Sequence, residues 1–295
     1  YEMHAADRDK FEILAFHDGT VKDFAEMDEK LAGTKRSIWR GRDLPFPILL
    51  DAQEDDRGAT VKAYEIQAFP TSLLFDPEGR LVGQAGIQSL EKKLPPVPMS
   101  TRIPRALDAY VALGVESIPL DNAVKFFSQE AHIPITIDAD SLKSAGVDPA
   151  VVVPLKLSAG LSLRSWLELM LEPFGLEARP GDEGLVIARA APAPPRREPS
   201  MVQKESALRI EEVLAKPASY DFKDATLEAV AQHFENKTNE NFVLDPVGRK
   251  AKLIDPEAVV SGSAKDVPLR EGLEKLLAPL GLKVVVKDEV VLFTK

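Results

Sequence analysis

The chain of 295 residues contains no cysteine. This absence excludes disulfides, a thiolate nucleophile, cysteine-ligated zinc and iron–sulfur clusters from these residues. Aromatic residues are scarce, at 6%, and 37 basic residues are outnumbered by 47 acidic ones, which gives a net charge of −10. That balance argues against a phosphate-binding surface spread over the chain. We therefore predict no nucleic-acid partner.

Membrane and cofactor signals are also missing. No run approaches the ~20 apolar residues of a membrane span, and the first twenty residues lack the pattern of a secretory signal. Neither a Gly-x-Ser-x-Gly elbow nor a phosphate-binding glycine loop occurs. The histidines at 4, 17, 132 and 233 lack partners at metal-ligand spacing, and the acidic residues after Leu50 lack the order of a calcium loop. We predict no membrane span, metal or cofactor.

Proline is abundant instead, with 23 residues. It concentrates in two clusters, 95–98 and 192–199, where fixed φ angles and missing amide hydrogens favour extended spacers over packed elements. The clusters leave three pieces of domain size. The predicted organisation is a domain at 1–94, a linker at 95–103, a domain at 104–190, a proline-rich linker at 191–205 and a domain at 206–295.

The last two pieces are copies of one unit. Seven residues around a predicted helix recur 106 positions later, and five upstream residues recur 107 positions later, so a single-residue length difference separates the two groups. A repeat of this length is a whole domain rather than a solenoid unit. The matched residues of the first copy are Leu120, Phe127, Asp138, Asp148, Pro149, Leu163, Arg164, Leu167, Leu171, Pro173, Gly175 and Leu176.

The second copy predicts the element order β-α-β-β-α-β-β, an α+β layer of helices on a small sheet. Alternation predicts a strand at 219–223, and Asp224 is a candidate N-cap for the helix that follows. Further strands are predicted at 241–245 and 258–264. A leucine stripe predicts a helix from Pro268 to Leu280, and a hairpin follows Gly281. The first copy repeats this order, with Ser117 as the candidate cap.

This order, with its Leu-Arg…Leu…Leu-x-Pro-x-Gly-Leu core, resembles the secretin and TonB short N-terminal domain. The resemblance covers both repeats and is carried by packing residues. It implies periplasmic modules that dock on other proteins at the cell envelope.

Residues 1–94 have a different pattern. A strand at 11–16, a helix capped by Thr20 and ended by Gly33, a buried strand at 46–51 and a brief helix at 60–64 are expected. Phe-Pro-Thr at 69–71 then precedes an apolar strand and the type I turn residues Asp-Pro-Glu-Gly at 76–79. The piece is therefore predicted as α/β.

The stretch from Phe69 to Arg80, with Phe-Pro-Ile-Leu-Leu-Asp before it, resembles the second half of a thioredoxin-like domain of the redoxin and periplasmic thiol–disulfide oxidoreductase families. The resemblance implies that Pro70 is a cis-proline and that Phe69, Pro70 and Thr71 contact a bound substrate peptide. It also implies a first strand and a Cys-x-x-Cys helix upstream of Tyr1. We therefore expect the sequence to be a fragment of a longer protein, and these residues alone to be inactive in thiol exchange.

Arg164 and Arg270 are equivalent residues in the first turns of their helices, where the macrodipole disfavours a cation. A salt bridge within each repeat, or the carboxylate of a protein partner, explains an arginine at this position in both copies. Both alternatives stand at the level of sequence.

The resulting hypothesis is a cell-envelope or periplasmic redoxin-type thiol–disulfide oxidoreductase whose two C-terminal repeats are protein-docking modules. One alternative is a redox-inactive thioredoxin-like scaffold that serves only for interaction. Another is that residues 1–94 belong to a different α/β binding fold, in which case a trans Phe69–Pro70 bond is expected.

Overall fold

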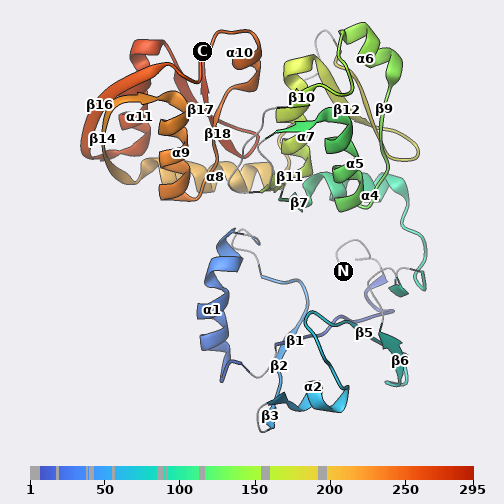
Figure 1. The fold of residues 1–295 in the computed structure, drawn as a ribbon. Helices are drawn as coiled ribbons and strands as arrows, with labels where there is room; N and C mark the ends of the chain where they lie inside the picture. Colours follow the sequence, from blue (N-terminus) through green and yellow to red (C-terminus); the bar gives the residue numbers. More distant parts are fainter. Residues whose placement is uncertain are drawn as a thin grey trace. The chain divides into compact units, whose positions relative to one another are not determined.

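The protein is a mixed α/β chain that divides into two compact units, Tyr1–Thr101 and Arg102–Lys295. Figure 1 shows the computed structural model. The structure describes residues 7–17, 20–37, 39, 43–54, 57–84, 89–90, 92–112, 117–153, 160–191 and 198–295.

The described part of the first unit contains short strands and the helices α1 and α2. Strands β1 and β2 are parallel, whereas β3–β4 and β5–β6 are antiparallel pairs. The elements are β1 (Ala15–His17), α1 (Phe24–Ser37), β2 (Ile48–Leu50), β3 (Gln53–Glu54), β4 (Arg57–Gly58), α2 (Ala59–Ala63), β5 (Leu73–Phe75) and β6 (Leu81–Gln84).

Helix α1 differs from its prediction at both ends. It begins at Phe24, where the Asp23 carboxylate accepts a hydrogen bond from the Glu26 amide at 2.8 Å, so Asp23 rather than Thr20 caps it. It also continues through Gly33 to Ser37. Glycine lowers helix stability without ending a helix by itself.

The β5–β6 hairpin confirms the predicted turn. The Gly79 amide donates to the Asp76 carbonyl at 2.9 Å, and Gly79 has a φ of +79°. The preceding Phe69–Pro70 peptide bond is cis, as the resemblance to redoxins predicts.

Asp51 is a buried cap of α2. Its carboxylate accepts hydrogen bonds from the amides of Thr60 (2.9 and 3.1 Å) and Val61 (3.2 Å). Burial raises the pKa of Asp51, but these bonds outweigh it, so the pKa lies below its usual value. Gly58 is required beside it, because a Cβ there falls 2.0 Å from Asp51 Oδ2.

Gly58→Ala is therefore expected to displace the Asp51 carboxylate and destabilise α2 by about 2 kcal/mol. Hydrogen exchange of the Thr60 and Val61 amides should accelerate accordingly. Gly33→Ala is the matched control, since nothing lies within 4 Å of the added Cβ and exchange in α2 should not change. Unchanged α2 exchange in Gly58→Ala contradicts the assigned role of Asp51.

The second unit contains the two repeats, each with a leading helix, a two-stranded ribbon and a three-stranded sheet (Figure 1). The first repeat comprises α4 (Met99–Asp108), β7 (Tyr110–Val111), β8 (Ile118–Pro119), α5 (Leu120–Glu130), β9 (Ile135–Ile137), α6 (Ala139–Ala145), β10 (Val152–Val153), β11 (Leu161–Ser162), α7 (Leu163–Leu171), η2 (Glu172–Phe174), β12 (Leu176–Pro180) and β13 (Leu185–Arg189).

The second repeat has the same order with longer ribbon strands. It comprises α8 (Met201–Ala215), β14 (Pro217–Thr226), α9 (Leu227–Thr238), β15 (Phe242–Leu244), α10 (Pro246–Lys250), β16 (Val259–Pro268), α11 (Leu269–Leu277), η3 (Ala278–Leu280), β17 (Lys283–Lys287) and β18 (Val290–Thr294).

Sheet topology agrees with the internal duplication. The sheet orders are β12-β13-β9 and β17-β18-β15, each with one antiparallel and one parallel pair. The ribbon β14–β16 corresponds to two shorter pairs in the first repeat, β7–β11 and β8–β10.

Within the described residues of the two repeats, four helices differ from the prediction by being additional: α4 and α8, which lead the repeats, and the short α6 and α10. The two leading helices move the boundaries, because α4 begins at Met99 and α8 at Met201, both inside the predicted linkers. A capping box explains the second start, since the Ser200 and Gln203 side chains each bond the other's backbone.

Two predicted N-caps in the repeats are also wrong. Helix α9 is capped by Thr226, whose hydroxyl accepts from the Ala229 amide at 3.2 Å, whereas Asp224 lies in β14 with a φ of +48°. Helix α5 follows Pro119 without a side-chain cap, so Ser117 does not cap it. In both cases the ribbon strand runs directly into the helix, later than the sequence pattern suggests.

The predicted apolar stripes form the cores of the repeats. In each core one large aromatic ring packs at the same helix position, but in the first repeat it comes from the helix and in the second from a strand. Trp166 of α7 is buried and donates from Nε1 to the Val111 carbonyl at 2.9 Å. The equivalent helix position is Gly272, where the strand residue Tyr220 packs instead and donates to the Gly272 carbonyl at 2.6 Å. Volume is conserved across the duplication although the residue that supplies it is not.

Candidate functional site

The residues that the redoxin resemblance assigns to substrate contact lie in one exposed turn before β5. Phe69 is 61% exposed and Pro70 is exposed, while the Thr71 hydroxyl donates to the Ala68 carbonyl at 2.5 Å. The turn therefore presents its backbone and one large apolar ring to solvent.

Arg164 and Arg270 each form an ion pair within their own repeat. Arg164 Nη2 lies 3.3 Å from Asp108, the last residue of α4. Arg270 Nη2 donates to both carboxylate oxygens of Glu211 on α8 at 2.7 Å, and its Nη1 donates to the Val284 carbonyl at 3.2 Å. The salt-bridge alternative is thus present in both copies, and contact with a partner stays a prediction.

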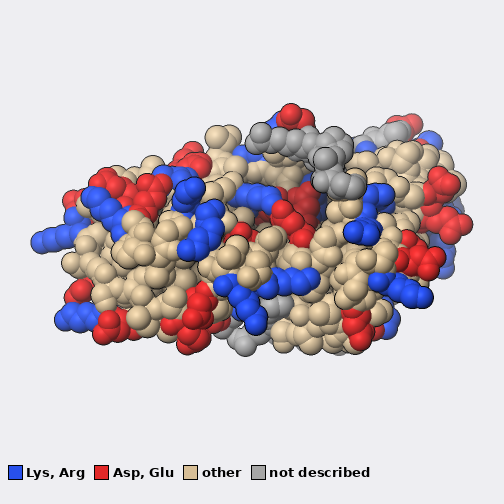
Figure 2. Space-filling model, turned by 90° about the horizontal axis from the view of Figure 1, so that it is seen from above, with Lys and Arg blue, Asp and Glu red and all other residues tan. Residues whose placement is uncertain are grey.

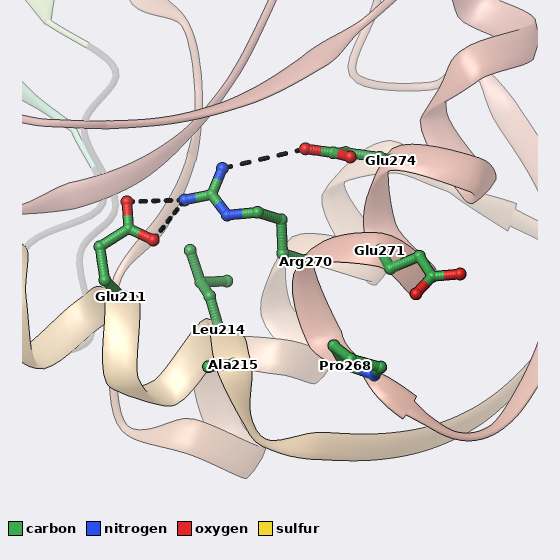
Figure 3. A pocket seen from close by; sticks show the side chains of 7 residues that line it. All are labelled: Glu211, Leu214, Ala215, Pro268, Arg270, Glu271 and Glu274. Carbon is green, nitrogen blue, oxygen red and sulfur yellow. Dashed lines mark hydrogen bonds and ion pairs between the residues drawn. The ribbon is translucent and has the colours of Figure 1, made fainter.

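Arg270 also lines a pocket of about 240 Å³ between α8 and α11 (Figure 3). Its apolar lining is Leu214, Ala215 and Pro268, and its charged lining is Arg270, Glu211, Glu271 and Glu274. Glu211 is occupied by Arg270, and Glu271 accepts from Lys275 at 2.7 Å. The pocket therefore joins an apolar floor to one arginine and three carboxylates.

Charge reversal tests the role of Arg270. Arg270→Glu and Glu211→Arg are each expected to lower the free energy of unfolding by about 1 kcal/mol, because each places like charges together on two partly exposed helices. The double variant restores the attraction. Urea denaturation should place it near the unaltered protein, and strict additivity of the two losses contradicts a direct Arg270–Glu211 pair.

A charged side chain with several hydrogen bonds lies where the two repeats meet. The Glu289 side chain extends from the tip of the β17–β18 hairpin to the N-terminus of α7, and the residue is 3% exposed. Its Oε1 accepts from the Ser162 amide (3.1 Å) and the Ser165 hydroxyl (2.9 Å), as well as from the Ser162 hydroxyl. Its Oε2 accepts from the Ser206 hydroxyl of α8 at 3.0 Å.

The contacts around Glu289 define an inter-repeat interface made by Ser162, Ser165, Ser206, Gln203, Asp288 and Glu289. Gln203 Nε2 donates to the Ser165 hydroxyl (3.2 Å) and to Glu168 (3.0 Å). Lys287 bonds Glu172 across the repeats at 2.7 Å, and Lys250 Nζ lies 4.1 Å from the Phe174 ring centroid. Figure 1 shows α8 running along the lower side of the second repeat as far as the edge of the first. The repeats therefore pack together as one unit.

The sequence offers one signal for this interface, at the hairpin tip. Asp288 and Glu289 both have positive φ angles, +51° and +63°. Two-residue hairpin turns of this kind favour Asn-Gly, because other residues are strained there. Glu289 thus occupies the second position of the turn, where glycine is preferred. The hydrogen bonds of its side chain at α7 compensate for the backbone strain.

Glu289→Ala is expected to lower the free energy of unfolding by about 2–4 kcal/mol, because it leaves buried hydroxyl and amide donors without their acceptor. Glu183→Ala is the matched control. Glu183 is the equivalent residue of the first repeat and is exposed, so its change should stay within about 0.5 kcal/mol. Equal stability losses in the two variants, measured by urea denaturation, exclude a special role for Glu289.

Charges of both signs are mixed on one face of the molecule. On the face shown in Figure 2, lysine and arginine side chains alternate with aspartate and glutamate. Among the described residues, no group of three or more His, Asp or Glu side chains is placed to hold a metal ion. Of the residues weighed for metal binding, His4, Asp55 and Asp56 lie outside the described part.

No protein family, curated protein or solved structure matches the chain. None of the helices in the described ranges is long and apolar enough to cross a membrane.

Proposed function

We propose that the chain belongs to a cell-envelope thiol–disulfide oxidoreductase of redoxin type. In this proposal residues 1–94 are part of a thioredoxin-like domain, and the two repeats are protein-docking modules of the secretin and TonB short N-terminal kind. The observation that carries the redoxin part is the exposed turn Phe69-Pro70-Thr71, which leads into the β5–β6 hairpin.

An uncovered apolar face supports the same proposal. Phe16 and Leu49 are register partners in the parallel pair β1–β2, and they are 50% and 37% exposed. Leu14, two residues before Phe16, is 53% exposed. Parallel strands are usually covered on both faces. The family resemblance implies a first strand and a redox helix upstream of Tyr1. These elements are suited to cover the exposed face of the β1–β2 pair.

Packing of the repeats supports the docking part. The inter-repeat interface fixes two modules in one unit, which presents a larger surface of constant geometry to a protein partner. Preorganisation of this kind lowers the entropy cost of association.

The full-length protein with its native residues upstream of Tyr1 is expected to contain Cys-x-x-Cys and to reduce insulin disulfides. Phe69→Ala should lower kcat/KM about tenfold without changing the melting temperature, because it removes one apolar substrate contact. Phe24→Ala, which alters a ring that is 52% exposed on α1, should leave kcat/KM unchanged.

Absence of the upstream cysteines, or an inactive full-length protein, overturns the redox assignment. The alternative is then a redox-inactive scaffold, which the complete lack of cysteine in these 295 residues favours. Equal kcat/KM values for Phe69→Ala and the unaltered protein contradict the assigned role of the turn.

A further inference from the structure

A second carboxylate, that of Asp288, is buried beside Glu289 in the inter-repeat interface, and one of its oxygens lacks a hydrogen-bond donor in the described part of the chain. The Asp288 side chain is 8% exposed, and its Oδ2 has no hydrogen-bond partner within the described residues. The nearest cation is Lys287, whose Nζ lies 3.5 Å from Oδ2. That ammonium is shared, because it also bonds Glu172 at 2.7 Å.

The charges that face Asp288 are predominantly negative. Helix α7 contributes Glu168 and η2 contributes Glu172, one helical turn apart. The hairpin itself contributes Glu289 and the single cation Lys287. On α8, Arg209 lies near Glu289 but is paired with Glu240 at 2.8 and 3.0 Å. With all four carboxyls ionised, the interface carries more negative than positive charge in a buried setting, which is costly.

Protonation of one carboxyl relieves this imbalance, and Asp288 is the group that takes the proton. Burial above all, and after it the neighbouring Glu168 carboxyl, raise the pKa of Asp288 to about 8 against the opposing charge of Lys287. At neutral pH Asp288 is therefore mostly protonated, so that its O–H can donate a hydrogen bond to the neighbouring Glu168 carboxyl of the other repeat.

We propose that contact between the two repeats is controlled by protonation: one proton shared by Asp288 and Glu168 keeps the hairpin tip on α7, and its loss releases the tip and lets the repeats separate. This inference is independent of any redox activity. It predicts that the two repeats are in contact under mildly acidic conditions and separate under mildly alkaline ones.

The direction follows from linkage. A released tip exposes Asp288 to water, where its pKa returns to about 4, whereas in the closed interface it is about 8. The open state therefore binds fewer protons between these values, and the opening constant rises by up to about tenfold per pH unit from pH 5 to pH 8. Above pH 8 both states are deprotonated and the constant levels off.

Amide hydrogen exchange of the full chain tests this, because it detects rare opening. The probe is the Ser162 amide at the N-terminus of α7, which donates to Glu289. After correction for the intrinsic pH dependence of exchange, its protection should fall by about 50- to 100-fold between pH 6 and pH 8. In Asp288→Asn, which keeps a donor toward Glu168 and cannot ionise, protection should be constant over this range.

Asp182→Asn is the matched control, since Asp182 occupies the equivalent hairpin position of the first repeat and is exposed. It should retain the full pH dependence. Glu168→Gln provides a second test that does not alter the hairpin, and it should reduce the pH dependence. Constant protection in the unaltered protein, or the same pH dependence in Asp288→Asn, overturns the proposal. Circular dichroism at each pH separates release of the tip from global unfolding.

Discussion

The arrangement of the two repeats depends on one buried carboxylate, Glu289, which accepts hydrogen bonds at the N-terminus of α7. That location combines unsatisfied backbone donors with the positive end of a helix dipole, so it favours an anion. The contact draws together α7, α8 and the β17–β18 hairpin, which belong to different repeats. It also compensates for two left-handed residues at the hairpin tip.

The two repeats share their order of elements, but only one of them can receive this carboxylate. The equivalents of Ser162 and Ser165 in the second repeat are Pro268 and Glu271. Proline has no amide hydrogen to donate, and a glutamate repels an incoming carboxylate. The first repeat thus supplies amide and hydroxyl donors, and the second repeat supplies the accepting carboxylate at its hairpin tip. The two repeats differ at these polar positions, so the contact forms with the first repeat as donor and the second as acceptor. Their shared apolar positions maintain the same fold in both.

The sequence predicts what periodicity and turn chemistry determine. The leucine stripes, the β17–β18 hairpin and the turn at 76–79 follow from such local patterns. Helices α4 and α8 escape prediction because they begin next to proline-rich stretches that indicate linkers. For the Arg270–Glu211 pair, the sequence indicates the arginine, because it occurs at the same position in both repeats. It does not indicate Glu211, because that residue lies on α8, which was not predicted. The inter-repeat interface is not predictable in this way, because Ser162 and Glu289 are 127 positions apart.

Fixed packing of the two repeats is the central claim, and the distance between them tests it most directly. The lack of cysteine allows two spin labels to be placed without ambiguity, on Lys143→Cys in α6 and Glu228→Cys in α9, both exposed. Double electron–electron resonance at pH 6 should give one narrow distance distribution for the full chain, and a broader one when Glu289→Ala is added. A broad distribution in the presence of Glu289 contradicts the account, because it means that the repeats move independently of this contact.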